Sequence, residues 1–290
     1  MFLLRINYYL INLYSNTNDL KYWKNTKTLD NLIPELLQIC DPSEADIAVI
    51  GSKKIDLDSM PSLRGIFKCG VGVDNVPFEK AKSRFIEICL PSEKTRNYIF
   101  EETANFAVYL ILKSLFADLG NLDQWTKTSR SFLGKRKVLV MGLGNIGKQV
   151  VRKLDPSLQV LTFDILHNLS NELRPLIVQS DIVSIHLPLN DSTLGFFDSE
   201  KLSWMKDGAT LVNTARGPIV DESALYDEIC SGRLRAAFDV FWEEPYHGRL
   251  KSFHPHSFCM SPHVASNCQD FLDGLAKDFY SFKDQLDETV

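Results

Sequence analysis

Beyond residue 136, apolar runs typical of buried strands recur along the chain, and most segments between them have helical apolar spacing. The six runs cover residues 137–141, 158–163, 181–186, 209–214, 235–240 and 258–261. Strands that alternate with helices predict a doubly wound parallel sheet with right-handed crossovers. We therefore expect an α/β domain with ligand-binding residues at the carboxyl ends of its strands.

Residues 1–95 have the pattern of a smaller α/β unit. Strand-like runs occupy residues 2–11, 46–50, 63–68 and 85–90, and residues 29–40 have helical spacing. A long helical run, 97–116, leads out of this unit, and residues 119–135 read as a polar arm or linker. A last helical run, 269–286, is expected to return to the first unit. The pattern predicts two domains, residues 1–96 plus 269–290 and residues 97–268.

Three glycines follow the first of the six strand-like runs, with the spacing G-x-G-x-x-G at Gly142, Gly144 and Gly147. In a dinucleotide site they permit a tight turn, approach of the backbone to a pyrophosphate, and close packing of the next helix. Asp164 ends the next run, 22 residues after Gly142 (164 − 142). A carboxylate there would hold a ribose 2′-hydroxyl, although an ordinary helix cap is the alternative. The combination predicts a site for NAD, because no Arg or Lys directly follows Asp164 to meet the 2′-phosphate of NADP.

The composition excludes several other functions. Hydrophobic residues make up 44% of the 290 residues and charged residues 24%, as in ordinary globular proteins. No apolar run approaches the ~18 residues of a membrane span, and a net charge of −5 argues against nucleic-acid binding. Six scattered cysteines without zinc-type spacing favour reduced thiols in the cytoplasm and no metal site.

Side chains suited to acid–base and anion chemistry follow three of the later strands. They are Arg216, Glu244 and His263, and the carboxyl ends of parallel strands line one crevice. Arginine offers a planar fork to a carboxylate or carbonyl oxygen. Histidine exchanges a proton near neutral pH, and a carboxylate beside it favours its charged form. A surface ion pair and a turn-capping histidine are the alternative, but three such residues at three strand ends favour a catalytic set.

In six segments the chain resembles the D-isomer-specific 2-hydroxyacid dehydrogenases. The segments are Gly70–Asn75 (GVGVDN), the glycine motif 142–147, Asp181–Leu189 (DIVSIHLPL), Asn213–Asp221 (NTARGPIVD), Asp239–Pro245 (DVFWEEP) and Ser261–His263 (SPH). They lie in the family's order and cover about residues 65–268. The resemblance implies a Rossmann cofactor domain and a smaller, flavodoxin-like α/β substrate domain.

The resemblance also implies roles for particular residues. In the family the arginine of A-R-G binds substrate, the glutamate before the proline pairs with the histidine of P-H, and that histidine is the general acid/base. These positions are Arg216, Glu244 and His263 here. The G-V-G turn would bind the substrate carboxylate through the amides of Val71 and Gly72. The expected cofactor contacts are Gly142, Gly144, Asn145, Ile146, Gly147, Asp164, His186, Pro188, Thr214, Ala215, Asp239 at the nicotinamide amide, and His263.

The expected activity is interconversion of a 2-keto acid and a D-2-hydroxy acid with NAD. A homodimer is expected from the resemblance and from the apolar helical run 99–116, although the arm at 119–135, which helps family members to dimerise, is a few residues short. Two alternatives stay open: a dinucleotide-sensing corepressor or scaffold of the same fold, and a dehydrogenase of formate or phosphite. The chain departs from the family pattern at 91–102, where Glu101 replaces a usually small residue.

Overall fold

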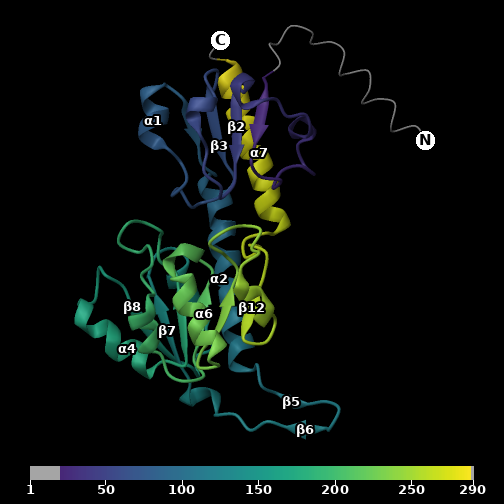
Figure 1. The fold of residues 1–290 in the computed structure, drawn as a ribbon. Helices are drawn as coiled ribbons and strands as arrows, with labels where there is room; N and C mark the ends of the chain where they lie inside the picture. Colours follow the sequence, from purple (N-terminus) through teal and green to yellow (C-terminus); the bar gives the residue numbers. More distant parts are fainter. Residues whose placement is uncertain (1–19, 289–290) are drawn as a thin grey trace. The chain divides into compact units, whose positions relative to one another are not determined.

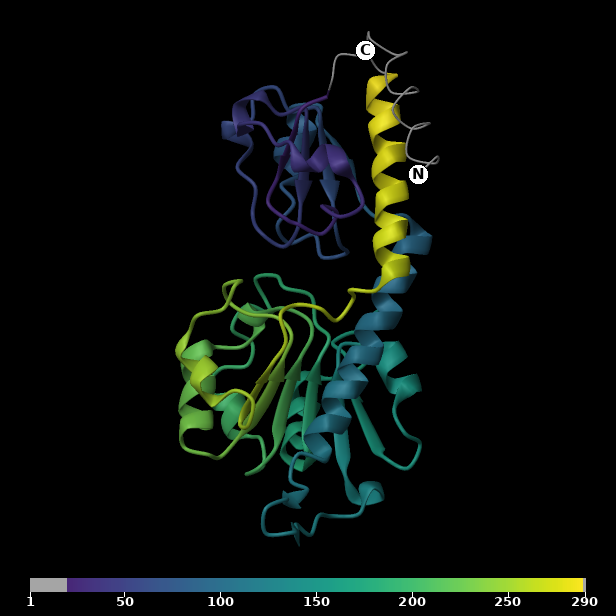
Figure 2. The ribbon, with the colours of Figure 1, turned by 90° about the vertical axis from the view of Figure 1, so that its right-hand side faces the viewer.

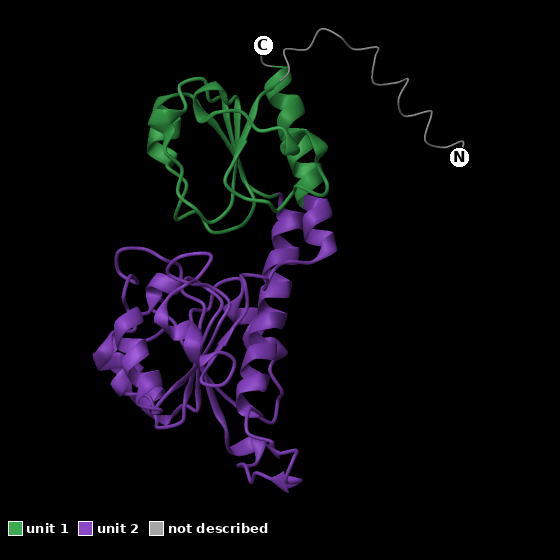
Figure 3. Cartoon of the chain, turned by 45° about the vertical axis from the view of Figure 1, so that its right-hand side comes forward, with its two compact units in different colours: residues 1–91, 275–290 green, residues 92–274 purple. Residues whose placement is uncertain are grey.

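A computed structural model of the chain describes residues 20–288. These residues belong to two compact units, one of residues 1–91 and 275–290 and the other of residues 92–274 (Figure 3). Each unit contains a parallel sheet, which confirms the expected α/β class. The strand expected at 2–11 lies outside the described residues.

The larger unit is built around a six-stranded parallel sheet (Figure 1). Its strands are β7 (Lys137–Met141), β8 (Gln159–Phe163), β9 (Ile182–Ile185), β10 (Thr210–Asn213), β11 (Arg235–Phe238) and β12 (Phe258–Met260), which confirms each of the six expected strands. Their spatial order is β12-β11-β10-β9-β7-β8. The order reverses between β7 and β9, and ligands of such sheets bind at this reversal.

Helices cover both faces of this sheet (Figure 2). They are α2 (Glu93–Leu115), α3 (Gly147–Lys153), α4 (Leu173–Gln179), α5 (Ser199–Ser203) and α6 (Glu222–Cys230). Val138 and Val140 of β7 pack in a core with α2 and α3, whereas Leu139 and Met141 pack in a second core with α4, α5 and α6. Successive side chains of a strand point to opposite faces, so a strand buried on both sides reads as one continuous apolar run.

The smaller unit has a four-stranded parallel sheet of β1 (Tyr22–Lys24), β2 (Ile47–Ile50), β3 (Gly65–Lys68) and β4 (Glu87–Cys89), in that order. A core on one face includes Ile66 and Ala81 of α1 (Phe78–Ser83). The other face meets α7 (Gln269–Asp287), whose Phe279 ring lies 5.3 Å from that of Phe67, edge to face. Helix α7 thus supplies part of the apolar core of the smaller unit.

The α-helix expected at residues 29–40 was a wrong prediction. The segment forms turns and one 3-10 helix, η1 (Pro34–Leu37), although Leu29, Ile33 and Leu36 are buried as the pattern required. Pro34 explains the difference, because its ring clashes with the carbonyl four residues earlier and it has no N–H to donate. The other 3-10 helices are η2 (Pro42–Glu44), η3 (Leu57–Ser59), η4 (Leu133–Lys135), η5 (Ser170–Glu172), η6 (Gly217–Ile219) and η7 (Arg249–Phe253).

Phe85 occupies a position that suits glycine. It follows α1 with φ of 56°, and the residue is 93% exposed. The Ile86 amide donates to the Ala81 carbonyl at 2.9 Å and the Phe85 amide to the Lys82 carbonyl at 3.1 Å. These two bonds make a helix end of the Schellman type, in which a left-handed residue is usually glycine.

We expect Phe85→Gly to raise the free energy of unfolding by about 1 kcal/mol, because left-handed backbone costs a non-glycine residue roughly 1–2 kcal/mol and this exposed ring contributes little burial. Urea denaturation would measure the change. Phe85→Ala is the control, since it removes the same ring but keeps the backbone strain. An equal rise in the free energy of unfolding of both variants would show that the change comes from loss of the ring and not from the backbone.

Candidate active site

The glycine motif makes a tight turn between β7 and α3. Gly142 has φ of +92°, and a Cβ there would lie 2.6 Å from the His186 carbonyl oxygen. A Cβ at position 147 would lie 1.9 Å from the Gly142 carbonyl oxygen, so only glycine fits. Around a Cβ at Gly144, by contrast, there is open space to at least 4 Å, and Asn145 beside it is exposed. The loop is therefore closed toward the protein and open toward solvent.

Asp164 holds this loop in place. One of its carboxylate oxygens accepts from the Leu143 amide at 2.6 Å and the other from the Leu166 amide at 2.9 Å. The hydrogen bond from Leu143, followed by that from Leu166, keeps the pKa of the carboxyl below its usual value. Asp164 is consequently ionised at neutral pH, beside the open glycine loop and at the end of β8.

His186 closes the loop from the side of β9. Its Nε2 lies 2.9 Å from Ser184 Oγ, and its carbonyl oxygen lies next to Gly142. Desolvation lowers the pKa of His186 to about 4, so the ring is neutral at physiological pH. Pro188 follows as an exposed residue whose carbonyl accepts from Thr193 Oγ1 at 2.6 Å. His186 therefore shapes the site without adding charge.

The turn after β10 is folded by the buried Asn213 side chain. Its amide group donates to the Arg216 carbonyl and accepts from the Ala215 amide, both at 2.9 Å. Thr214 in the same turn is buried, and its Oγ1 has no hydrogen-bond partner among the described residues. One guanidinium N–H of Arg216 donates to the Ala215 carbonyl at 2.8 Å.

His263 and Glu244 meet after β11 and β12. His263 Nδ1 lies 2.9 Å from Oε2 and 3.0 Å from Oε1 of Glu244. Glu244 Oε1 also accepts from the Phe241 amide at 3.2 Å. His263 has φ of +54°, an uncommon value for a residue with a side chain. Because Glu244 holds Nδ1, the other ring nitrogen, Nε2, is the one left for a reacting group.

Asp239 follows the last residue of β11 and contacts the segment that carries His263. It is fully buried, and Oδ1 accepts from Ser261 Oγ at 2.6 Å and from the Val264 amide at 3.0 Å. Oδ2 accepts from the Ala265 amide at 2.9 Å. Ser261 was not among the expected site residues, although its position beside Pro262 and His263 placed it in the same segment.

Val71 and Gly72 belong to the smaller unit and follow β3. Asn75, in the same turn, connects it to the loop after β2 by hydrogen bonds. The side-chain amide of Asn75 donates to the carbonyls of Gly51 at 2.9 Å and Lys53 at 2.6 Å. The buried Lys68 ammonium donates to the same Gly51 carbonyl. The sequence analysis did not single out Lys68 and included Asn75 only as the end of the segment Gly70–Asn75, because the partners of both side chains come from another strand end.

Glu101, the residue that departs from the family pattern, faces α3. Its carboxylate lies 3.2 Å from the Lys153 ammonium, and the Glu101 side chain is 61% exposed. Such an exposed pair adds little stability, but it accounts for a charged residue on α2 at this position.

The larger unit has the features that a dinucleotide requires. Gly144 leaves room for a pyrophosphate, Asp164 offers a carboxylate for ribose hydroxyls, and Thr214 Oγ1 is a buried polar atom that lacks a partner in the described chain. Within residues 20–288, no group of three or more His, Cys, Asp or Glu residues could hold a metal ion, and no helix is long and apolar enough to cross a membrane.

Comparison with known proteins gives consistent matches. Residues 117–265 match the model of the D-isomer specific 2-hydroxyacid dehydrogenase, NAD binding domain. Hydroxypyruvate reductase of Thermotoga maritima is 32% identical over 231 residues, 73% of each chain. D-Lactate dehydrogenase of Aquifex aeolicus, solved with NAD and lactic acid, superposes with a TM-score of 0.72 at 23% identity over 89% of this chain and 86% of that one. An NADPH-dependent glyoxylate/hydroxypyruvate reductase of Sinorhizobium meliloti, solved with NADP and malonate, gives 0.69 at 23% identity over 89% and 90%.

Proposed function

Because the chain belongs to the D-isomer-specific 2-hydroxyacid dehydrogenases, oxidoreductases that act on CH–OH donors with NAD or NADP, we propose that it reduces a 2-keto acid to the D-2-hydroxy acid with NADH. The contact between His263 Nδ1 and Glu244 at 2.9 Å carries this proposal. His263 is a proton donor, and the Glu244 carboxylate stabilises its charged form. Both residues lie after strand ends of the sheet, where ligands of such sheets bind.

When bound, the reduced nicotinamide supplies a hydride to the keto carbon. His263 donates the Nε2 proton to the carbonyl oxygen, and the C=O group becomes CH–OH. Glu244 stabilises the imidazolium before transfer and fixes the orientation of the ring. Arg216 binds the substrate carboxylate with its planar fork. In the smaller unit, the family resemblance supports a carboxylate-binding role for the amides of Val71 and Gly72.

An assay of NADH oxidation with glyoxylate, hydroxypyruvate, pyruvate and bulkier 2-keto acids tests the proposal. Turnover of at least one of them is the expected result, with the D isomer formed wherever the product is chiral. NADH binding without turnover of any keto acid would contradict it and favour the corepressor or scaffold alternative. Reduction of NAD with formate or phosphite, in the absence of any keto-acid turnover, would change the substrate class.

We further propose that the cofactor is NAD rather than NADP. Asp164 carries a negative charge beside the glycine loop, and the two residues after it, Ile165 and Leu166, are apolar and exposed. A 2′-phosphate would meet a carboxylate there, with no cation directly following.

NADH should therefore bind at least about tenfold more tightly than NADPH, a difference of about 1.4 kcal/mol. Fluorescence titration gives both Kd values. Asp164→Ala should lower the ratio of the Kd for NADPH to the Kd for NADH. Asp155→Ala is the control: it changes an exposed carboxylate elsewhere in the same unit and should leave this ratio unchanged. Equal or tighter NADPH binding by the unmodified protein would refute the preference.

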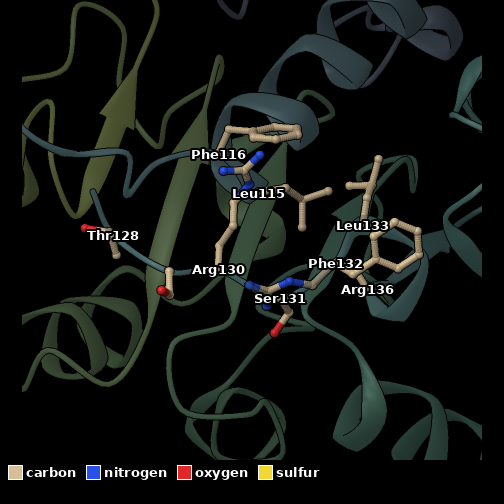
Figure 4. A pocket seen from close by; sticks show the side chains of 9 residues that line it. Leu115, Phe116, Thr128, Arg130, Ser131, Phe132, Leu133 and Arg136 are labelled. Atoms are coloured by element: carbon tan, nitrogen blue, oxygen red, sulfur yellow. The ribbon is translucent and has the colours of Figure 1, made fainter. Parts of the chain in front are cut away.

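A homodimer is the proposed assembly, and the arm supports it. The antiparallel pair β5 (Gly120–Asn121) and β6 (Thr126–Lys127) forms its tip. Four large apolar side chains of the arm are exposed: Leu119, Leu122, Trp125 and Phe132. At its base is a cavity of about 530 Å³, where the Arg130 guanidinium lies 4.7 Å from the centre of the Phe116 ring (Figure 4). Clustered exposed apolar residues are typical of interaction surfaces.

Sedimentation at micromolar concentration should give twice the chain mass. Trp125→Ser should shift the equilibrium toward the monomer, because it removes the largest of these exposed rings, which is 81% exposed. Phe85→Ser removes an aromatic ring that is also exposed but lies in the other unit, and should leave the mass unchanged. A monomeric unmodified chain would contradict the proposal.

A further inference from the structure

A lysine and a cysteine from distant parts of the chain meet in the larger unit. The Lys113 ammonium, near the end of α2, donates to Cys259 Sγ of β12 at 3.2 Å, although the two residues are 146 positions apart in sequence. Neither residue is among those proposed to bind the cofactor or the substrate. The pair is therefore a cluster of two reactive side chains that the proposed reaction does not use.

The surroundings hold the lysine nitrogen beside the sulfur. Cys259 is half-buried and packs against a core that includes Ala107 and Ile111 of α2. The Lys113 ammonium also lies 5.7 Å from the centre of the Tyr109 ring, four residues earlier on α2, which is a cation–π distance. The long lysine side chain thus has a contact on its own helix and a contact on β12, and its nitrogen stays near Cys259.

Three other cysteines are poorly suited to oxidation. Desolvation raises the pKa of Cys69 to about 12 and that of Cys89 to about 11, and it is the largest of the causes that raise the pKa of Cys40. Such thiols are scarcely ionised at neutral pH, and the thiolate is the form that attacks an oxidant. Cys259 differs from them in having an ammonium group at its sulfur, a typical neighbour of reactive cysteines.

Solvent can reach the pair. Lys113 is exposed, and a cavity of about 210 Å³ adjoins it, whose lining also includes Asp118, Arg235, His256 and Ser257. A water molecule in the liquid takes up about 30 Å³. The cavity therefore has room for a small oxidant such as hydrogen peroxide.

We propose that Lys113 and Cys259 form a covalent S–N crosslink when a peroxide oxidises the thiol. In the first step the sulfur attacks one oxygen of hydrogen peroxide, the O–O bond breaks, and the thiol becomes a sulfenic acid with release of water. In the second step the Lys113 amine attacks that sulfur, the S–O bond breaks and the S–N bond forms, with release of a second water. The sulfur loses two electrons to the peroxide, and the product has two hydrogens fewer than the reduced pair.

The lysine must lose a proton to solvent before the second step. Its hydrogen bond to Cys259 is the largest of the causes that raise the pKa of Lys113, so the group is an ammonium while that bond is intact. A neutral sulfenic acid accepts a weaker hydrogen bond from an ammonium than a charged sulfur does. Oxidation of the sulfur therefore makes the amine easier to deprotonate, and the two steps follow in this order.

The crosslink joins α2 to an edge of the larger sheet. Strand β12 is the last strand on its side and pairs with β11 alone among the strands of that sheet. The S–N bond gives this edge strand a second, covalent attachment. The chain runs from β12 directly into Ser261 and His263, so the oxidised thiol fastens the strand that leads to the proposed general acid.

Tryptic mapping of the full-length protein after treatment with equimolar hydrogen peroxide tests the proposal. Trypsin does not cleave at a modified lysine, so residues 97–127 should appear joined to residues 252–277. The joined mass should equal the sum of these two peptides less two hydrogens, and dithiothreitol should restore cleavage at Lys113. Normal cleavage at Lys113 with oxygen added to Cys259 would overturn the proposal. None of these measurements depends on turnover of a keto acid.

Lys113→Arg separates the two steps. It keeps a cation near the sulfur, but a guanidinium stays protonated and cannot supply a free amine. Cys259 should then be trapped by dimedone as the sulfenic acid, with no crosslink. A crosslink that survives in Lys113→Arg would overturn the proposal.

Cysteine variants identify the sulfur. Cys259→Ser should abolish the crosslink, whereas Cys268→Ser is the matched control, because Cys268 lies in the same tryptic peptide and its loss should leave the crosslink in place. The opposite result would assign the bond to Cys268 and overturn the proposal. Denaturing electrophoresis should show a single chain after oxidation, since the contact lies within one chain. A band of twice the chain mass that disappears in Lys113→Arg would place the bond between two chains and also overturn the proposal.

Discussion

His263→Ala should lower kcat for keto-acid reduction by roughly 10²- to 10⁴-fold, the range for losing a positioned general acid. NADH affinity should stay near that of the unmodified enzyme, because the glycine loop and Asp164 lie at other strand ends. Steady-state kinetics together with NADH fluorescence would separate the two effects. His256→Ala removes an exposed histidine of the same unit and serves as the control. A loss smaller than tenfold would mean that another group, or water, supplies the proton.

Glu244→Gln tests the partner of the histidine. The variant keeps the shape of the side chain but removes the charge that pairs with His263 Nδ1 at 2.9 Å. kcat/KM for reduction at neutral pH should therefore drop, while the Kd for NADH changes little. Activity equal to that of the unmodified enzyme would show that the His263–Glu244 pair is not the proton-transfer unit.

Arg216→Lys is expected to lower kcat/KM for the keto acid by about 10- to 100-fold. A hydrogen bond to a charged group contributes about 1.5–3 kcal/mol, and a lysine cannot reproduce a two-pronged contact with a carboxylate. The Kd for NADH should change little. Arg235→Lys is the matched control, since Arg235 pairs with Asp118 at 2.9 Å on the surface. Equal losses in both variants would remove Arg216 from substrate binding.

Much of the larger unit could be predicted because each of its signals is local. Val138, Leu139, Val140 and Met141 are all buried, so β7 reads as one apolar run. The spacing of Gly142, Gly144 and Gly147 is visible within six residues. The six strands of the larger parallel sheet were predicted from such signals, family membership was predicted from the resemblance of six segments, and both are confirmed.

The features that the sequence did not reveal depend on distant partners. The Asp239 carboxylate binds groups 22 to 26 residues away in sequence, and nothing near Asp239 indicates that both of its oxygens are occupied. The left-handed backbone of His263 has no local signal either, since glycine or asparagine usually marks such a position. The three-residue strand β1 is too short to display a period, and at residues 29–40 the apolar spacing concealed the effect of Pro34.

The division of the smaller unit between two segments of chain has a consequence for biosynthesis. Residues 20–91 leave the ribosome first, but the helix that covers one face of their sheet, α7, is translated only after the whole of residues 92–274. Until then Tyr22 and Phe67 lack Phe279, the ring that packs against both. The larger unit is continuous and can complete its core during synthesis, since domains generally fold as units on a growing chain. The aromatic surface of the nascent smaller unit, at Tyr22 and Phe67, therefore stays exposed until α7 has been translated.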